Sequence, residues 1–395
     1  MSHGPTRRPR ARDAPSAGRG PVVIAHGGDV SQPSGGTNRV SAFAAGLQRA
    51  GHDVTLVVPT PERSYAEALA DVEIRTVDVS TGSLASQPAR AVRVPREAKA
   101  IAEERDATIQ FEHSTLGGVG ALLGCTDFVL DMHDLAFASP LYGDLPLGSL
   151  VQRVIRLIET RAVRNAKHIV VVSERMRELV AEEWGIPEGR ITVVPNGYFI
   201  ETVAGFEDVE TVEGRVVFLG TLHPKLDVEA FVEVARLPEV EEFLVIGDGA
   251  RREDLLEVKE RYGLDALRVE GYLPDEEAFE LVASSAVAIN PQNPSRLQQA
   301  SSPVKLFYYA ALGVPTVVTE GPDAAAELAE RGAGRSVPAE GPFAETVAEV
   351  LRDAEGRREM ATAARRIAEE WTWSERAADL ERVYDEMART ERAGG

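Results

Sequence analysis

Cysteine and lysine are scarce in this chain of 395 residues, and long apolar runs do not occur. Cys125 is the single cysteine, so an intrachain disulfide and a cysteine-based metal site are excluded. No stretch approaches the roughly 18 continuous apolar residues of a membrane span, and residues 1–20 lack the apolar core of a signal peptide. These absences predict a protein of the reducing cytoplasm, free or peripheral at the inner membrane face.

Basic residues are also fewer than acidic ones. The chain has 43 basic and 63 acidic residues, and its formal net charge is -20. A charge of this sign repels nucleic-acid phosphates, so we expect no nucleic-acid partner. Lysine occurs only at positions 99, 167, 225, 259 and 305. Two of these lysines, Lys225 and Lys305, lie at predicted helix starts.

The chain length predicts two or three domains, and we start from two. Residues 1–20 combine five arginines with Pro, Ser and Gly and show no periodicity, which indicates a flexible arm. An arm of this charge is also a candidate for peripheral membrane contact. We expect a first domain over residues 21–200, a second over 201–370 and a closing helix over 371–395, with residues 201–214 as the hinge.

Short β-branched runs that lack alternation and are separated by helix-length segments are typical of buried parallel strands. The predicted strands are residues 21–25, 54–58, 108–111, 128–130, 168–172 and 191–194, then 216–220, 243–247, 267–269, 287–289 and 315–318. This pattern predicts an α/β fold with two Rossmann-like doubly wound domains that face a cleft. Ligands of such sheets bind outside the carboxyl ends of the strands, so the loops there are the candidate sites.

Two glycine-rich loops follow predicted strands. Gly35, Gly36 and Thr37 open the first helix, where backbone N–H groups can approach an anion that the helix dipole favours. Gly247 and Gly249 open a helix of the second domain in the same way. Neither loop has a Walker or Gly-x-Gly-x-x-Gly pattern, so NAD is not expected. The alternative for both loops is a tight turn without a ligand.

Lys225 and Lys305 both lie at predicted helix starts of the second domain. A lysine there opposes the helix dipole unless an anion accompanies it, so the pair predicts a shared phosphate group. Solvated surface lysines are the alternative.

His133 and Asp134 end a buried strand of the first domain and are predicted to face the cleft. His133 could position a substrate hydroxyl, and Asp134 could act as a base or orient the imidazole. The alternative for Asp134 is a helix cap. Glu112 and His113 end a neighbouring strand and are further candidates for the same place. No spacing typical of a metal site occurs, so we expect no metal.

Over about residues 21–390, the chain resembles the GT-B glycosyltransferases, and family 4 in particular. The first-domain signature of that family is similar to residues 35–40 and 51–54, and later signatures are similar to residues 172–175, 194–197 and 271–274, the last of which contains Tyr272. The resemblance implies a nucleotide diphosphate sugar bound mostly by the second domain and an acceptor bound mostly by the first. It also implies a last helix that crosses back to the first domain.

The chain departs from the family pattern in two places. Ala300 and Tyr308 stand where most members have a pair of glutamates, and Gly220-Thr221 replaces the usual Gly-Arg of the second domain's first loop. A subgroup with Ser-Pro-x-Lys-Leu is more similar, and there the lysine contacts the donor diphosphate. This implies donor contacts from Ser302, Pro303, Lys305 and Leu306.

The resemblance implies a hexosyltransferase that works without a metal and retains the anomeric configuration, because the donor phosphate takes the acceptor proton. No cofactor is expected beyond the sugar nucleotide, which is a substrate. An inverting relative would need a carboxylate base, for which Asp134 is the candidate. A sugar-nucleotide epimerase and a non-catalytic nucleotide- or partner-binding protein stay open as alternatives. The acceptor can be a glycan, a lipid-linked glycan or a small molecule.

Overall fold

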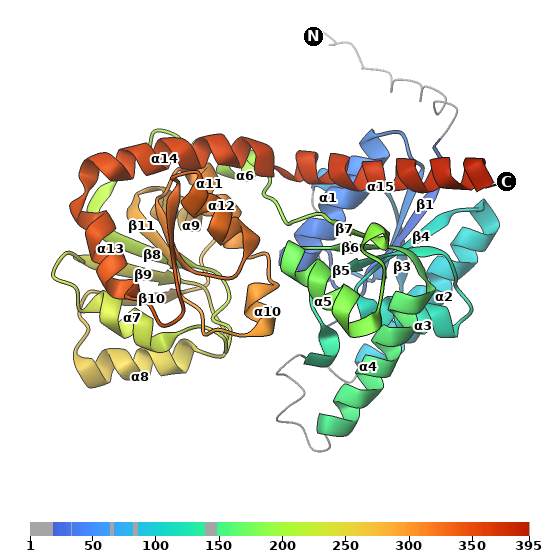
Figure 1. The fold of residues 1–395 in the computed structure, drawn as a ribbon, viewed down its shortest axis with the longest axis horizontal. Coiled ribbons are helices and arrows are strands. Elements are labelled where there is room, and N and C mark those ends of the chain that lie inside the picture. The colour runs from blue at the N-terminus through green and yellow to red at the C-terminus, as the bar shows by residue number, and fades with distance from the viewer. Residues whose placement is uncertain (1–18, 33, 64–66, 82–85, 139–147, 395) are drawn as a thin grey trace, which may run out of the picture.

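The computed structural model describes residues 19–32, 34–63, 67–81, 86–138 and 148–394. These residues form two α/β domains that lie side by side, each built on one parallel sheet (Figure 1). The predicted fold class, two Rossmann-like doubly wound domains, is confirmed. The predicted arm over residues 1–20 lies almost entirely outside the described residues.

Seven parallel strands form the sheet of the first domain, in the order β3-β2-β1-β4-β5-β6-β7. The order runs outward in both directions from the centre, which is the doubly wound arrangement. The strands are β1 (Val22–Ala25), β2 (Val54–Pro59), β3 (Glu73–Val77), β4 (Thr108–Glu112), β5 (Phe128–Met132), β6 (Ala166–Val171) and β7 (Ile191–Val193). The helices are α1 (Gly35–Arg49), η1 (Glu67–Leu69), α2 (Gln87–Arg105), α3 (Ser114–Leu122), η3 (Ala136–Ala138), α4 (Gly148–Asn165), α5 (Glu174–Trp184) and η5 (Glu188–Arg190). The short helix α6 (Ile200–Val203) follows and packs against the second domain.

Six parallel strands form the second sheet, in the order β10-β9-β8-β11-β12-β13. The strands are β8 (Val212–Leu219), β9 (Glu242–Ile246), β10 (Leu267–Gly271), β11 (Ser285–Asn290), β12 (Thr316–Thr319) and β13 (Gly334–Val337). The helices are α7 (Val228–Ala235), α8 (Arg252–Tyr262), α9 (Asp275–Ala283), α10 (Arg296–Gln299), α11 (Val304–Leu312), α12 (Asp323–Glu330), α13 (Phe343–Arg352), α14 (Ala354–Ala368), η6 (Glu369–Trp371) and α15 (Trp373–Gly394). None of the described helices is both long and apolar enough to cross a membrane.

The sequence pattern predicts all the central strands and the edge strands β7 and β10. Every residue of β1, β2, β5 and β11 is buried, because helices cover both faces of each sheet. The edge strands β3 and β13 were not predicted, since polar residues interrupt their apolar pattern. The predicted hinge over residues 201–214 is wrong at its end, because β8 already begins at Val212 with exposed residues.

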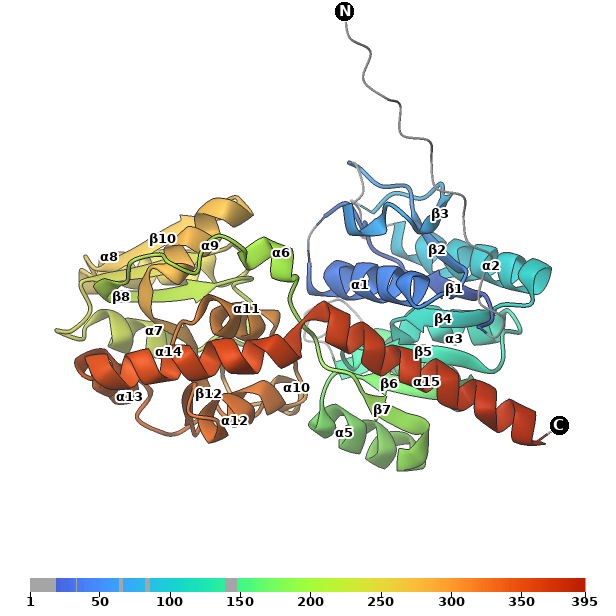
Figure 2. The same cartoon turned by 90° about the horizontal axis from the view of Figure 1, so that it is seen from above.

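The closing helix α15 crosses from the second domain back to the first, as Figure 2 shows. It packs along α1, where Trp373 meets the ring of Phe43 edge-on at 6.0 Å between centroids. Gly46 permits the close approach, because a Cβ there would lie 2.2 Å from Cβ of Ala377. The hydroxyl of Tyr384 donates to Gln110 at 2.7 Å. The implied crossing helix is therefore confirmed.

Hydrogen bonds join the two domains where the carboxyl ends of the first sheet face the second domain. Ser173 Oγ donates to the carbonyl of Ala300 at 2.7 Å. The side-chain amide of Asn196 donates to the carbonyl of Ser302 at 2.8 Å. These contacts bring the segment before α11 against the first domain.

Candidate active site between the two domains

The N-termini of α1 and α11 meet across the domain boundary. A Cβ on Gly35, the first residue of α1, would lie 3.5 Å from Cγ2 of Val304, the first residue of α11. Both helix ends present unpaired backbone N–H groups and positive dipole ends. The structure thus brings the predicted glycine-rich start of α1 next to the predicted helix start that carries Lys305.

The loop before α1 is shaped by a capping box. The amide of Thr37 donates to Ser34 Oγ at 3.2 Å, and the amide of Ser34 donates to Thr37 Oγ1 at 2.7 Å. The Thr37 hydroxyl also donates to the carbonyl of Gln32 at 2.7 Å. Thr37 therefore fixes the loop, and its direct contact with a donor stays a prediction.

Lys305 follows Val304 in the first turn of α11, and its ammonium lies 3.6 Å from the ring centre of Phe218 on β8. A Cβ on Gly220 would lie 3.2 Å from Cε of Lys305, so the glycine leaves room for this side chain. No carboxylate of the described residues pairs with Lys305. Burial lowers the pKa of Lys305 well below its ordinary value, and the nearby Lys225 lowers it further. An anionic ligand would relieve this electrostatic conflict.

Lys225 lies near Lys305 but not in a helix. The N-cap of α7 is Asp227, whose carboxylate accepts from Glu229 and Ala230, so Lys225 belongs to the preceding loop. This corrects the predicted placement in a first helical turn. Burial lowers the pKa of Lys225, while the charge of Asp134 opposes that shift from the first domain.

The other residues predicted to bind the donor differ in their surroundings. Leu306 is fully buried in the core of the second domain, which corrects its assignment as a donor contact. Ser302 accepts from the amide of Asn196 at 3.2 Å through its hydroxyl, and Pro303 is the N-cap of α11. Tyr272 follows β10 with 71% of its surface exposed.

Gly247 and Gly249 adopt positive φ angles of 135° and 148°. A Cβ on Gly247 would lie 2.1 Å from the carbonyl oxygen of Gly220, and a Cβ on Gly249 would lie 2.7 Å from that of Leu222. Close backbone packing therefore explains why both positions are glycine, and the predicted donor contact of this loop stays a prediction.

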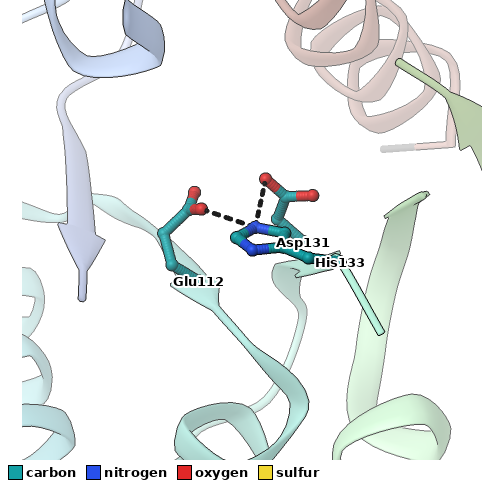
Figure 3. A group of neighbouring side chains, drawn as sticks. All are labelled: Glu112, Asp131 and His133. Carbon is teal, nitrogen blue, oxygen red and sulfur yellow. Dashed lines mark hydrogen bonds and ion pairs between the residues drawn. The ribbon is translucent and has the colours of Figure 1, made fainter. Parts of the chain in front are cut away.

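His133 forms a cluster with the buried carboxylates of Glu112 and Asp131 at the ends of β4 and β5 (Figure 3). Its Nε2 lies 3.2 Å from Glu112 Oε2 and 3.4 Å from Asp131 Oδ2. Both oxygens of Asp131 also accept from Arg39, at 2.7 and 2.9 Å. The other ring nitrogen, Nδ1, lies 3.9 Å from the Cβ position of Gly36. The imidazole is thus aimed at the start of α1.

The charges of this cluster are strongly coupled. Burial alone would lower the pKa of His133, but the Asp131 charge and the hydrogen bonds that Asp131 and Glu112 accept from the ring raise it to about 9. Burial would raise the pKa of Asp131, yet Arg39 and His133 hold it well below its ordinary range. Burial and the Asp131 charge raise the pKa of Glu112. At neutral pH His133 is therefore an imidazolium whose Nδ1–H can donate to a ligand.

Glu112, Asp131 and His133 have donor atoms within 4.8 Å of one another, a spacing that could suit a metal ion. The chemistry of the set does not fit one. Both oxygens of Asp131 are occupied by Arg39, and a protonated His133 has no lone pair for a metal. The cluster is better described as an internally neutralised network.

Asp134 turns away from His133. Its Oδ1 lies 3.1 Å from Nε2 of His113, while Thr115 donates to Nδ1 of that histidine. The prediction that Asp134 orients the His133 imidazole is therefore wrong, because Glu112 and Asp131 do so. His113 holds φ at 95°, a conformation that costs a non-glycine residue about 1–3 kcal/mol. Asp134 is exposed, which leaves it accessible to a substrate.

His26 is a residue of this site that the sequence analysis missed. It follows β1, is buried, and neither of its ring nitrogens has a partner. Its Cε1 lies 3.9 Å from the Cβ position of Gly36, so it flanks the same helix start as His133. Burial lowers the pKa of His26 to about 3, with help from the charges of His133 and His113. His26 is therefore neutral and can donate from one ring nitrogen and accept at the other.

Arg39 and Asp131 were also missed. A usable signal existed for Asp131, because a carboxylate inside an apolar strand requires a buried partner. No comparable signal marked Arg39, which lies within the amphipathic pattern of α1.

Two family models match the chain, one over each of the two domains. Residues 34–197 match a glycosyl transferase 4-like domain, and residues 226–382 match a glycosyl transferase-like domain. The chain belongs to the GT-B glycosyltransferases. This GT-B glycosyltransferase thus places its paired helix starts, α1 and α11, one in each family domain.

One curated protein resembles this glycosyltransferase in sequence over about half of the chain. A putative teichuronic acid biosynthesis glycosyltransferase, TuaH of Bacillus subtilis (strain 168), is 27% identical over 212 residues, which cover 52% of this chain and 53% of that protein. The match therefore spans about half the length of the curated relative.

Solved structures resemble nearly the whole glycosyltransferase. Sucrose-phosphate synthase from Thermosynechococcus elongatus has a TM-score of 0.76 at 15% identity and covers 94% of this chain and 100% of its own. Anabaena HepE in complex with UDP and glucose has a TM-score of 0.67 at 15% identity, covering 93% of this chain and 100% of its own. At such identities the likeness shows the fold.

Proposed function

We propose that this glycosyltransferase moves a hexosyl group from a nucleotide diphosphate sugar to a hydroxyl of a glycan or lipid-linked acceptor, retaining the anomeric configuration and using no metal ion. The observation that carries the proposal is the meeting of two helix N-termini beside the Lys305 ammonium, which lacks a carboxylate partner among the described residues. A diphosphate supplies the negative charge that all three groups attract.

Transfer breaks the bond between sugar C1 and a diphosphate oxygen and forms a bond between C1 and the acceptor oxygen. The acceptor proton moves to the leaving diphosphate oxygen, so no protein nucleophile is required. Lys305, Lys225 and the N–H groups of Gly35 and Gly36 stabilise the charge that develops on that oxygen. These groups need little reorganisation, because the protein already holds them in place.

His133 is the positioning residue for the transferred sugar in this proposal. Glu112 and Asp131 fix the ring through Nε2, which leaves Nδ1–H to donate to a sugar hydroxyl beside Gly36. His26 approaches the same place as a neutral donor or acceptor.

The first donor to test is UDP-glucose, because solved structures of HepE, which shares the fold, hold UDP, glucose and UDP-glucose. The nucleoside contacts must differ from those of most family 4 members. Ala300 and Tyr308, which replace the glutamates, are both buried, so neither offers a carboxylate to a ribose.

The test is donor binding and turnover by the purified protein across nucleotide diphosphate sugars. A ligand at about 100 times its dissociation constant should stabilise the fold by about 2.7 kcal/mol, which a thermal-shift screen detects. Lys305→Ala should lose donor affinity, while Lys259→Ala on α8, which changes a lysine of the same domain outside the site, should not. Equal donor affinity in both variants would show that the diphosphate site is wrongly placed.

Inversion is the second candidate mechanism, and one observation favours it. Asp134 is an exposed carboxylate whose orientation is fixed by His113, as a general base for an acceptor hydroxyl would require. The anomeric configuration of the product, read by NMR, separates the two mechanisms. An inverted product together with a loss of about 10³-fold in kcat for Asp134→Asn would replace retention.

Two other functions make different predictions. A non-catalytic protein would bind the nucleotide but show neither hydrolysis nor transfer above background. An epimerase would change the configuration of the donor sugar without an acceptor. Product analysis with and without acceptor distinguishes all three.

A further inference from the structure

We infer that the outer face of α4 is a docking surface for an anionic lipid membrane. Leu150, Val154 and Leu157 form an apolar stripe on this helix and are 55%, 50% and 69% exposed. Nine large hydrophobic side chains are exposed among the described residues, and these three share one helix face. The inference does not depend on the sugar or the acceptor.

Arginines extend and flank the stripe. Arg153, Arg161 and Arg164 are exposed, and none forms an ion pair with a described residue. At about 100° per residue, the three apolar side chains and the three arginines fall within a sector of about 100° on the helix. Arg156 lies outside this sector and pairs with Glu183. The only acidic residue of α4, Glu159, is buried.

This positive face contrasts with the chain as a whole, whose net charge is -20. Anionic lipids attract basic side chains next to an apolar patch, and long arginine side chains can lie along the apolar surface with their charge in the headgroups. A basic amphipathic helix of this kind binds in the plane of a membrane surface.

The helix is held rigidly against the domain that carries His133. A Cβ on Gly118 of α3 would lie 2.1 Å from the carbonyl oxygen of Ile158, so α3 and α4 pack backbone to backbone. The Glu159 carboxylate accepts from Ser114 Oγ at 2.6 Å and from the amide of Ala136 at 2.9 Å. Figure 1 shows α4 projecting from the body of the first domain, which leaves its far end clear of the sheet.

A protein partner fits this surface less well than a membrane. A stable protein interface buries about 800 Å² on each partner, more than three side chains on one helix can offer. The stripe is also narrow and flanked by charges of one sign. These features match the boundary between lipid headgroups and acyl chains.

The test is co-sedimentation of the full chain with vesicles of phosphatidylcholine alone or with about 30% phosphatidylglycerol, at about 0.1 M salt. We expect binding to the anionic vesicles, weakened at higher salt. The L150Q/V154Q/L157Q variant should bind at least about tenfold more weakly. The R153E/R161E variant should also lose the preference for anionic lipid.

Matched controls keep the result specific. Val92→Gln on α2, where Val92 is 43% exposed, and Arg366→Glu on α14 should bind like the wild type. Circular dichroism and thermal unfolding should show that every variant is folded. The full-chain variant R7S/R8S/R10S/R12S should keep most of its binding.

Four outcomes would overturn the inference. In the first, the wild type would bind neither vesicle. In the second, the stripe and arginine variants would bind like the wild type. In the third, binding would disappear only when the arginines of residues 1–20 are replaced. A self-association that the stripe variant abolishes, without vesicle binding, would assign the face to a second copy of the chain.

Discussion

Gly35 and Val304 start two helices in different domains, and the Cβ position of one lies 3.5 Å from Cγ2 of the other. Two positive helix ends are thereby held together, with the Lys305 ammonium in the same turn as Val304. The first domain supplies the N-terminus of α1, and the second supplies the N-terminus of α11 with Lys305. A donor diphosphate bound there would contact both domains and favour the arrangement that brings them together.

Gly36→Ala should separate folding from donor binding. A Cβ on Gly36 meets no atom nearer than 3.9 Å, so the folded protein accommodates it, and alanine favours the helix by up to about 1 kcal/mol. The same methyl group would stand where a diphosphate approaches the backbone. We expect an unchanged or higher melting temperature and donor affinity reduced about tenfold or more, measured by calorimetry. Gly189→Ala, where a Cβ also meets nothing within 4 Å, is the control.

Donor binding should take up a proton at Lys305. Its pKa is lowered in the ligand-free protein, and a bound diphosphate favours the charged form and raises it. Affinity should therefore fall as pH rises above the lowered pKa of the free Lys305 amine, because binding then requires protonation. Calorimetry in buffers of different ionisation enthalpy measures the proton uptake.

Lys305→Arg is the matched variant for this linkage, because a guanidinium stays charged at every accessible pH. It should bind the donor with less dependence on pH and no proton uptake at this position. Proton uptake that persists in this variant would assign the linkage to another group, such as Lys225.

The sequence predicts the sheets well because their central strands are buried on both faces and are therefore uniformly apolar, as in β1 and β2. It misses two of the four edge strands, β3 and β13, and predicts the other two, β7 and β10. β3 carries Glu73 and Arg75, whose charges are tolerated only because one side of this strand is unpaired and faces solvent.

The candidate site was predicted where a residue type implies a ligand by local chemistry, as for Lys305 at a helix start. It was not predicted where the partner is distant in sequence. Arg39 and Asp131 are 92 residues apart and meet only through the fold. Likewise, the neighbouring positions of His133 and Asp134 suggested a pair, but successive residues after a strand point to different sides and take different partners.

Arg39→Met should destabilise the first domain strongly. Arg39 and Asp131 are both fully buried, so the substitution removes the guanidinium that donates to both Asp131 oxygens and leaves His133 as the remaining cation beside that carboxylate. Loss of one partner of a buried pair costs about 3–5 kcal/mol, which chemical denaturation would detect. Arg75→Met, which breaks an exposed pair with Glu73, should cost about 0–1 kcal/mol. A small loss for Arg39→Met would mean that Asp131 takes up a proton or finds another partner.

His26 and His133 should give the protein opposite pH dependences. The folded-state pKa of His26 is about 3, below its unfolded value of about 6.5, so its effect on stability is lost as pH falls from about 6.5 towards 3. The folded-state pKa of His133 is about 9, so its contribution is present below about 6.5 and is lost as pH rises through about 9. We expect His26→Gln to flatten the acid side of the stability curve and His133→Gln to flatten the alkaline side.

The two variants control each other, since each should leave the other side of the curve largely unchanged. They are also coupled, because the charge of His133 contributes to the low pKa of His26. His133→Gln should therefore raise the pKa of His26, as read from its ring proton shifts by NMR. An unchanged His26 pKa in that variant would mean that His133 is neutral in the folded protein, and its proposed role as a charged donor to the sugar would fail.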